Sequence, residues 1–350
     1  MNRRAFLGAS AAAATLAAAP VAKATVARTR QSDRLKVLIP ATMNADLVED
    51  LKATAPGVDL VACRDQAEAL EQIDDADATS GFGNAELIAK GQRLRWIQWN
   101  SAGVENIVFL PELQSSEIVL TNMQRVFGPP IADQAIGYLL AFTRQLEHFI
   151  QTKSQQQWMQ RPYTIDFDEL AGKTMLVVGL GGIGQEIARR AYGLGMTVLA
   201  TDPKVLDCPR DVEELHRPDA IEKLLPRADV VVSAVPLTPE SRQMFNASTF
   251  GLMKPGVLFV NVSRGGVTDT AALISALKSG HVAAAGLDVT DPEPLPAGHP
   301  LWDQNVIITP HSAGVSAGSD RRKHEVFKEN LRRFSQGLML LNVVDKQAGY

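Results

Sequence analysis

The sequence predicts an α/β protein of two domains, each built on a parallel β-sheet. Short apolar runs alternate with helical patterns along most of the chain, which is typical of parallel sheets covered by helices on both faces. A long helical pattern beginning at Pro130 divides this alternation into two series. The chain has 350 residues, of which 45% are hydrophobic and 21% charged, so it is long and apolar enough to form two cores.

The N-terminal segment 1–24 has the features of an export signal. Arg3 and Arg4 precede a short uncharged run, and the motif A-K-A ending at Ala24 is the small-x-small pattern that a signal peptidase recognises. The run is shorter than the roughly 20 residues that a membrane-spanning helix needs. The paired arginines followed by Phe-Leu resemble the twin-arginine export signal. We therefore expect cleavage after Ala24 and a periplasmic protein, or a cytoplasmic one if the signal is not used.

The first series of apolar runs begins after a polar linker. Its runs are short enough to form strands, and the segment 46–53 between the first two has a helical pattern. In chain order the predicted strands are LKVLIP (35–40), VDLVA (58–62), DATS (77–80), RWIQW (95–99) and SSEIVLTN (115–122). The long helical pattern that follows places apolar residues three or four apart as far as Ile150, and it ends in the polar stretch QTKSQQQWMQRP, which we interpret as a boundary arm.

The second series predicts a larger parallel sheet. Its six strand-like runs are KTMLVVGL (173–180), MTVLATD (196–202), ADVVVSAVP (228–236), GVLFVNVS (256–263), VAAAGLDV (282–289) and NVIITP (305–310). Six strands are the number expected of a doubly wound sheet that binds a dinucleotide. The final helix, about 318–337, has no strand left in this series to pair with. We expect it to pack on the first domain together with the last residues, LMLLNVVDKQAGY.

A glycine-rich loop follows the first strand of this second series. Gly179, Gly181 and Gly184 form the pattern G-x-G-x-x-G between the strand TMLVV and the helix QEIARRAYGLG. These glycines allow a tight turn, close approach of the backbone to a pyrophosphate, and close packing of helix on strand. The phosphates then lie at the positive helix N-terminus. Asp202 ends the next strand, where its carboxylate can bind a ribose hydroxyl. Its charge favours NAD over NADP, although neighbouring Lys204 weakens this preference.

Three polar residues follow predicted strands of the same sheet. Arg264 comes after GVLFVNVS, Glu293 lies shortly after VAAAGLDV, and His311 comes after NVIITP. Each residue alone is ordinarily a surface or structural group. Because open α/β sheets bind ligands at the carboxyl ends of their strands, the shared placement predicts a functional site.

Composition excludes several other classes of function. The net charge is −4, and the only basic tract is Arg321-Arg322-Lys323, so neither nucleic acid nor an anionic membrane surface is an expected partner. The two cysteines, Cys63 and Cys208, are far apart, and nothing in the sequence favours their pairing. No Cys/His cluster with the spacing of metal ligands is present, so we expect no metal.

The motifs together resemble the D-isomer-specific 2-hydroxyacid dehydrogenase family, and the similarity spans nearly all of the chain after the export signal. The matching stretches are RWIQWNSAGVENI, LAGKTMLVVGLGGIG, ADVVVSAVPLTPESRQMFN, MKPGVLFVNVSRGGVTD, GLDVTDPEPLP and NVIITPHSAG. The resemblance implies that Arg264, Glu293 and His311 are the catalytic arginine, glutamate and histidine. It also implies that the Ser101–Val104 loop, which includes Ala102 and Gly103, offers backbone N–H groups to a substrate carboxylate, beside Arg264.

The same resemblance implies the domain organisation. A Rossmann-type cofactor domain, residues 128–312, would interrupt a discontinuous flavodoxin-like substrate domain, residues 33–127 and 313–350, with the active site in the cleft between them. Family members usually form homodimers through the cofactor domain, so we expect a homodimer. We expect four further residues to bind the cofactor, namely Gly182, Ile183, Pro236 and Asp288.

These roles agree with the chemistry of reducing a 2-oxo acid to a D-2-hydroxy acid. A guanidinium group binds a planar carboxylate through two parallel hydrogen bonds, which suits Arg264. The carbonyl oxygen gains negative charge as hydride reaches C2, and a protonated His311 would neutralise it. Glu293, bonded to the other ring nitrogen, would fix the tautomer of the imidazole.

The substrate and two alternative functions stay open. Glyoxylate and hydroxypyruvate are the first candidates, and the pocket is expected to use the loop Ala41–Ala45, Asn100 and Trp302. Asp133-Gln134 stands where relatives often have Glu-His, and Thr290 replaces a common aromatic residue. Formate-oxidising relatives have glutamine in place of Glu293, whereas phosphite oxidation is compatible with the three polar residues. An exported NAD(H)-binding sensor with little turnover is the alternative from another class.

Overall fold

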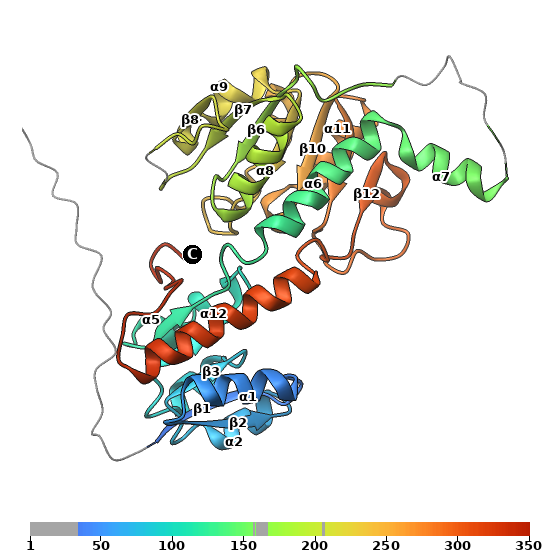
Figure 1. The fold of residues 1–350 in the computed structure, drawn as a ribbon. Coiled ribbons are helices and arrows are strands. Elements are labelled where there is room, and N and C mark those ends of the chain that lie inside the picture. Colours follow the sequence, from blue (N-terminus) through green and yellow to red (C-terminus); the bar gives the residue numbers. More distant parts are fainter. Residues whose placement is uncertain (1–33, 157, 159–166, 205–206) are drawn as a thin grey trace, which may run out of the picture.

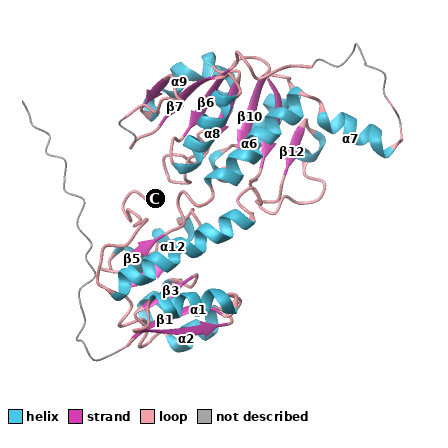
Figure 2. Ribbon diagram, viewed as in Figure 1, coloured by secondary structure: helices cyan, strands magenta, loops and turns pink. Residues whose placement is uncertain are grey.

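The computed structural model describes residues 34–156, 158, 167–204 and 207–350 (Figure 1). They form two parallel sheets with helices around them, so the two-domain α/β fold predicted from the sequence is confirmed (Figure 2). The predicted export signal, residues 1–24, lies outside the described residues. Among the helices in the described part of the chain, none is long and apolar enough to cross a membrane.

The first sheet has five strands in the order β2-β1-β3-β4-β5. All five are parallel and correspond to the five predicted runs: β1 (Leu35–Pro40), β2 (Val58–Cys63), β3 (Ala78–Ser80), β4 (Trp96–Gln98) and β5 (Val119–Thr121). The connecting helices are α1 (Ala45–Thr54), α2 (Gln66–Gln72), α3 (Ala85–Lys90), α4 (Glu105–Val108) and α5 (Pro111–Gln114). Side-chain caps start the first three helices, since Asn44, Asp65 and Asn84 each accept a backbone N–H of the first turn.

The second sheet has seven strands in the order β12-β11-β10-β9-β6-β7-β8. Six are the predicted ones: β6 (Thr174–Val178), β7 (Thr197–Thr201), β9 (Val230–Ser233), β10 (Val257–Asn261), β11 (Val282–Leu287) and β12 (Val306–Ile308). The seventh, β8 (Glu214–His216), was not predicted. It pairs with β7 at the edge of the sheet, and its three half-buried residues lack the apolar run that marks the central strands.

Helices cover both faces of this second sheet. The helices α6 (Gly128–Thr143) and α8 (Gly182–Gly193) contribute to the core on one face. On the other face the core includes side chains of α9 (Ile221–Leu224), α10 (Ala247–Leu252) and α11 (Thr270–Lys278). The strands between these layers are almost fully buried, which explains why they form continuous apolar runs in the sequence.

The long helical pattern predicted from Pro130 is two helices in the structure. The first, α6, begins earlier, at Gly128, and ends at Thr143; α7 (Leu146–Ser154) follows it. Between them Gln145 has a φ of 55°, a left-handed conformation that an α-helix cannot contain. The prediction of one continuous helix was therefore wrong. Apolar spacing persists across the break, because it reports which side chains are buried and not the backbone dihedral angles of the residues between them.

The last helix returns to the first sheet, where α12 (Ala317–Ser335) lies beside α1 (Figure 1). Phe327 and Phe334 pack on the fully buried ring of Trp96, with ring centroids 5.9 and 5.1 Å away. After α12 the chain runs along β5, where Thr121 forms an isolated antiparallel bridge with Val343. Both ends of the described chain therefore contribute to the first domain.

Candidate active site

The three predicted catalytic residues all lie past the carboxyl ends of adjacent strands. Arg264 is three residues beyond β10, Glu293 follows β11, and His311 is three residues beyond β12. These strands are neighbours in the second sheet, in the order β12-β11-β10. The sequence pattern therefore placed the three residues at one edge of one sheet.

His311 and Glu293 form a hydrogen-bonded pair. The Nδ1 atom of His311 lies 2.7 Å from the Oε1 atom of Glu293, and the two side chains are 44% and 40% exposed. Both residues line a cavity of about 460 Å³, whose wall also includes Thr290, Leu295 and Trp302. With Nδ1 facing a carboxylate, Nε2 is left as the ring nitrogen for exchanging a proton with a substrate.

The backbone around His311 is fixed by Asp288. His311 has a φ of 54°, and its N–H donates to the carbonyl oxygen of Asp288 at 2.8 Å. The Asp288 carboxylate, only 3% exposed, accepts the N–H groups of Ser312 and Ala313 at 2.9 to 3.1 Å. The Thr309 hydroxyl donates to it as well, at 2.5 Å. Asp288 therefore positions the loop that carries His311; its predicted contact with the cofactor stays a prediction.

A tyrosine from α6 extends this network. The hydroxyl of Tyr138 is hydrogen-bonded to the hydroxyl of Thr309, and burial raises the pKa of the Tyr138 phenol. Its ring also lies against Gly286 of β11, where an added Cβ would come within 2.6 Å of the Tyr138 ring. The helix that joins the two domains thus contacts the strand and the loop that precede His311.

Arg264 reaches across to the first domain. Its Nε donates to Oε1 of Glu105 at 2.5 Å, and its Nη1 donates to the carbonyl oxygen of Ser263 at 2.7 Å. A Cβ added to Gly103 would lie 1.8 Å from Nη2 of Arg264, so only glycine allows this approach. The structure therefore brings together Arg264 and the Ser101–Val104 loop, which the sequence predicted to bind a substrate carboxylate.

Glu105 was missed by the sequence analysis. It starts α4 directly after the Ser101–Val104 loop, and its carboxylate contacts the guanidinium of a residue 159 positions away. Local spacing cannot reveal a partner so distant in sequence. The one available signal was an acidic residue next to a loop already expected to face an arginine.

The other predicted pocket residues divide into two groups. Trp302 is half exposed, lines the cavity beside His311, and donates its indole N–H to the carbonyl oxygen of Pro296 at 2.9 Å. Asn100 instead accepts a hydrogen bond from Ser80 at 3.3 Å within the first domain. Neither Asn100 nor the loop Ala41–Ala45 is part of the lining of the His311 cavity.

The glycine loop has the geometry that a dinucleotide needs. Gly179 has a φ of 93°, and a Cβ added to Gly184 would lie 2.0 Å from the carbonyl oxygen of Gly179. By contrast, a Cβ added to Gly181 would meet nothing within 4 Å, so open space faces the loop at the start of α8. Because the exposed N–H groups of a helix N-terminus bind phosphates, this opening fits the pyrophosphate of a dinucleotide.

Asp202 lies beside this opening. Its Oδ2 accepts the N–H of Leu180 at 2.9 Å, and its Oδ1 accepts the N–H of Lys204 at 2.8 Å. Of the other predicted cofactor residues, Gly182 and Ile183 begin α8, and the carbonyl oxygen of Pro236 accepts the hydroxyl of Ser241 at 2.6 Å. The residues present therefore fit a dinucleotide, although its contacts with each of them stay predictions.

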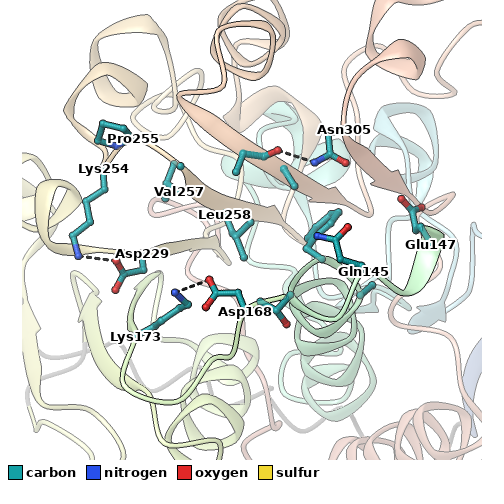
Figure 3. Close-up of a pocket in the computed structure, with 16 residues that line it drawn as sticks. Gln145, Glu147, Asp168, Lys173, Asp229, Lys254, Pro255, Val257, Leu258 and Asn305 are labelled. Atoms are coloured by element: carbon teal, nitrogen blue, oxygen red, sulfur yellow. Dashed lines mark hydrogen bonds and ion pairs between the residues drawn. The ribbon is translucent and has the colours of Figure 1, made fainter. Parts of the chain in front are cut away.

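A second cavity, of about 370 Å³, lies at the amino ends of the strands of the second sheet, whereas the predicted catalytic residues follow the carboxyl ends (Figure 3). Four of its charged side chains form two ion pairs: Lys173 contacts Asp168 and Lys254 contacts Asp229, each at 2.8 Å. None of the predicted site residues lines it. Nor do the described ranges contain a group of three or more His, Cys, Asp or Glu side chains that could hold a metal ion. The thiols of Cys63, buried, and Cys208, exposed, are both free.

Comparison with known proteins agrees with this geometry. Residues 136–313 match the family model described as the D-isomer specific 2-hydroxyacid dehydrogenase NAD binding domain. The chain is 31% identical over 319 residues to D-3-phosphoglycerate dehydrogenase of Methanocaldococcus jannaschii, covering 89% of this chain but only 59% of that relative. It is 34% identical over 288 residues to glyoxylate reductase of Pyrococcus furiosus, covering 79% and 85% of the two chains.

A solved structure extends the similarity to the whole fold. The D-isomer specific 2-hydroxyacid dehydrogenase of Xanthobacter autotrophicus, in complex with NADPH and MES, superposes with a TM-score of 0.77 at 28% identity, covering 91% of this chain and all of that one. Family model, sequence identity and fold therefore agree. The chain belongs to the D-isomer specific 2-hydroxyacid dehydrogenase family of oxidoreductases.

Proposed function

We propose that this protein catalyses the reversible, NAD-linked reduction of a small 2-oxo acid to a D-2-hydroxy acid. The observation that carries the proposal is the meeting of Arg264 with the Ser101–Val104 loop, on the same sheet edge as the His311–Glu293 pair. A guanidinium beside exposed backbone N–H groups binds a carboxylate, and an imidazole paired with a carboxylate exchanges protons. A 2-oxo acid needs both groups.

In this mechanism Arg264 binds the substrate carboxylate and orients the neighbouring ketone. Glu105 and the Ser263 carbonyl hold two of its nitrogen atoms, which fixes the plane of the guanidinium before a substrate arrives. The bound dinucleotide supplies the hydride. His311 donates a proton to the carbonyl oxygen during reduction and accepts it during oxidation, while Glu293 holds the ring through Nδ1.

The preference for NAD is part of the proposal. Support comes from the Asp202 carboxylate, which two backbone N–H groups hold beside the glycine loop, where it would repel a 2′-phosphate. The relative from Xanthobacter was solved in complex with NADPH, whereas the family model is described as an NAD binding domain, so membership of the family does not decide the preference. The ratio of kcat/KM for NADH to that for NADPH tests the preference directly. We expect a ratio above one that falls in Asp202→Ala, and a ratio below one in the unmodified protein would overturn it.

Glyoxylate and hydroxypyruvate are the proposed first substrates. The relative from Pyrococcus furiosus is a glyoxylate reductase, and the cavity beside His311 has the volume of a small ligand site. NADH consumption by the mature chain should be measured with a panel of 2-oxo acids, with Arg264→Ala alongside. Turnover of one acid that the variant loses supports the proposal. Binding of NADH without turnover of any acid would instead favour a sensor protein. NAD-dependent oxidation of phosphite would favour a phosphite-type dehydrogenase.

We also propose that the protein is exported and reaches the periplasm with its dinucleotide bound. The sequence of the N-terminal segment supports this location, and twin-arginine export is associated with proteins that fold before crossing the membrane. The test is fractionation of cells expressing the chain or its double variant Arg3→Lys, Arg4→Lys, with the nicotinamide content of the periplasmic protein measured. We expect about one nicotinamide per chain outside the cytoplasm. An empty periplasmic protein that binds added NAD would contradict the second half of the proposal.

A homodimer formed through the cofactor domain completes the proposal. Helix α7, which continues from α6 of that domain, presents Leu146 and Ile150 at 45% and 67% exposure. Exposed apolar side chains on a helix that extends from the domain are typical of a contact with another chain (Figure 1). Light scattering after size-exclusion chromatography should give twice the mass of one chain, and Ile150→Asp should lower it. A monomer at all concentrations would overturn this assignment.

A further inference from the structure

The last residues of the sequence are anchored on the first domain. We call residues 338–350 the tail. The backbone N–H of Val344 donates to the carbonyl oxygen of Leu120 at 2.9 Å, which continues the alignment of the tail along β5. The ammonium of Lys346 donates to the carbonyl oxygens of Leu113 and Ser116 at 3.0 and 2.6 Å, and burial lowers the pKa of this group. The tail is therefore a fixed part of the structure up to this point.

A tight turn then sets the direction of the final residues. The Asp345 carboxylate accepts the N–H groups of Gln347 and Ala348 at 3.0 Å each, and its carbonyl oxygen accepts the N–H of Gly349 at 2.8 Å. Gly349 has a φ of 80°, and a Cβ added there would lie 2.6 Å from the ring of Phe109. Only glycine fits both the conformation and the space, so the turn is specified by the sequence.

The carbonyl oxygen of Tyr350 accepts the N–H of Asp345 at 3.2 Å, which closes this turn, while the Tyr350 side chain contacts the second domain. The ammonium of Lys204 lies 3.7 Å from the centroid of the Tyr350 ring, which is a cation–π contact. In Figure 1 the C-terminus lies between the two sheets. Since α12 and the tail otherwise pack on the first domain, this contact joins the two domains in addition to the connecting helix α6.

The partner of Tyr350 belongs to the dinucleotide site. The backbone N–H of Lys204 donates to Asp202, the carboxylate that also receives the N–H of Leu180 from the glycine loop. Burial raises the pKa of the Tyr350 phenol, and the nearby carboxylates of Asp202, Asp345 and Glu240 raise it further. The ring therefore lies beside the group expected to bind the adenosine ribose.

We propose that Tyr350 and Lys204 form a latch that holds the two domains together at the adenosine end of the dinucleotide site and slows release of the cofactor. A dinucleotide bound in a cleft between two domains leaves when the domains separate, so a contact across the cleft mouth opposes its release. The inference uses only the dinucleotide-binding part of the proposed function. It also supplies a reason for an exported protein to retain its cofactor.

The test is the rate at which NADH leaves the full chain, measured by stopped-flow fluorescence after mixing the complex with excess NAD. A cation–π contact at a partly exposed site is worth a change of about 2- to 5-fold, so Tyr350→Ala should accelerate release by that factor. Tyr350→Phe keeps the ring and should stay near the original rate. Tyr192→Ala removes an exposed tyrosine at the C-terminal end of α8 and serves as the control.

Three further variants separate the latch from a general effect on the site. Lys204→Gln should accelerate release as much as Tyr350→Ala, and the double variant should be no faster than either single one. Lys346→Met should loosen the tail and speed release while Tyr350 itself is intact, with thermal unfolding measured to confirm that the chain is folded. Unchanged release in Tyr350→Ala, or fully additive effects of the two single variants, would overturn the latch.

These outcomes are distinct from a failure of the proposed function. Loss of turnover with every 2-oxo acid would leave the release rates measurable, because the assay contains no substrate. A folded, unmodified chain that does not bind NADH would overturn both the latch and the dinucleotide site.

Discussion

Arg264 and Glu105 join the two domains through one charge-assisted hydrogen bond, from Nε to Oε1 over 2.5 Å. Both side chains are only 24% exposed, so the pair is largely shielded from solvent. Because Nε is held by Glu105, the opposite edge of the guanidinium is the one that can face a substrate carboxylate. Glu105 is therefore a positioning residue for Arg264.

Replacing Glu105 tests this role. Glu105→Ala frees Nε, so the guanidinium loses its fixed plane, and we expect KM for the 2-oxo acid to rise by about tenfold, as for the loss of one charged hydrogen bond. Glu105→Gln keeps an acceptor and should change KM by less than about threefold. Initial rates with saturating NADH measure both. A lower KM in Glu105→Gln would show instead that Glu105 competes with the substrate for Arg264.

Replacing either residue of the His311–Glu293 pair should lower kcat without weakening the binding of NADH. His311→Gln removes the group that we propose exchanges the proton, and general acid–base catalysis is worth about 10²- to 10⁴-fold. Glu293→Gln keeps a hydrogen bond to Nδ1 but removes the charge, so we expect a smaller decrease. Fluorescence titration with NADH should give the same dissociation constant for all three proteins. Normal kcat in His311→Gln would remove His311 from the mechanism.

Two glycines of the same loop should respond in opposite ways to alanine. Gly181→Ala adds a methyl group to open space, so the melting temperature should be unchanged while affinity for NADH falls by at least about tenfold, because the backbone must approach the pyrophosphate. Gly184→Ala places a Cβ 2.0 Å from the Gly179 carbonyl oxygen and should lower the melting temperature. Calorimetry and NADH titration separate these effects. An unchanged affinity of Gly181→Ala for NADH would show that the pyrophosphate does not bind at this glycine.

Asp288 predicts a combined effect on stability and rate. Asp288→Ala leaves the N–H groups of Ser312 and Ala313 without their acceptor, and the loss costs about 1–3 kcal/mol for the buried N–H of Ala313. The loop carrying His311 then loses its support, so kcat should fall as well. Tyr138→Phe removes only the outermost hydroxyl of the network and should have a smaller effect on both. Normal kcat with weakened NADH binding would favour the predicted cofactor contact of Asp288 instead.

Glu214 of the edge strand β8 should contribute to stability in a way that depends on pH. Hydrogen bonds from Arg227 and then His216 lower the pKa of Glu214 from 4.5 to about 2. A depressed pKa stabilises the folded state above the unfolded value and loses that effect as the pH falls through the folded value. Glu214→Gln should therefore lower the melting temperature by about 1–2 °C at pH 7. The difference should shrink between pH 4.5 and pH 2. Glu222→Gln, an exposed glutamate on α9, is the control, and a difference constant with pH would contradict the assignment.

Most of the fold could be predicted because buried parallel strands leave a strong local signal. Strand β1, Leu35–Pro40, was predicted with its observed bounds, because a short apolar run between polar residues is typical of a buried strand. Strand β8 and the break at Gln145 were missed for a shared reason. The half-buried strand Glu214–His216 has no apolar run, and the apolar spacing of the helix continues across the left-handed Gln145, so neither feature leaves a local pattern.

Some residues of the candidate site could also be predicted from the sequence, and others could not. Arg264, Glu293 and His311 could be located from their positions after strands, because topology brings such positions to one edge. Glu105 and Tyr350 could not, since each acts through a partner more than a hundred residues away. The support that Asp288 gives to the His311 loop was also not visible, because a buried carboxylate bonded to backbone N–H groups has no sequence pattern of its own.

The return of α12 to the first sheet has a consequence for synthesis of the protein. Trp96 emerges from the ribosome long before Phe327 and Phe334, the rings that cover it. The second domain is contiguous, so a nascent chain can complete it while the first domain still exposes this indole. The core of the first domain can therefore close only after α12 has been synthesised and has returned to this sheet.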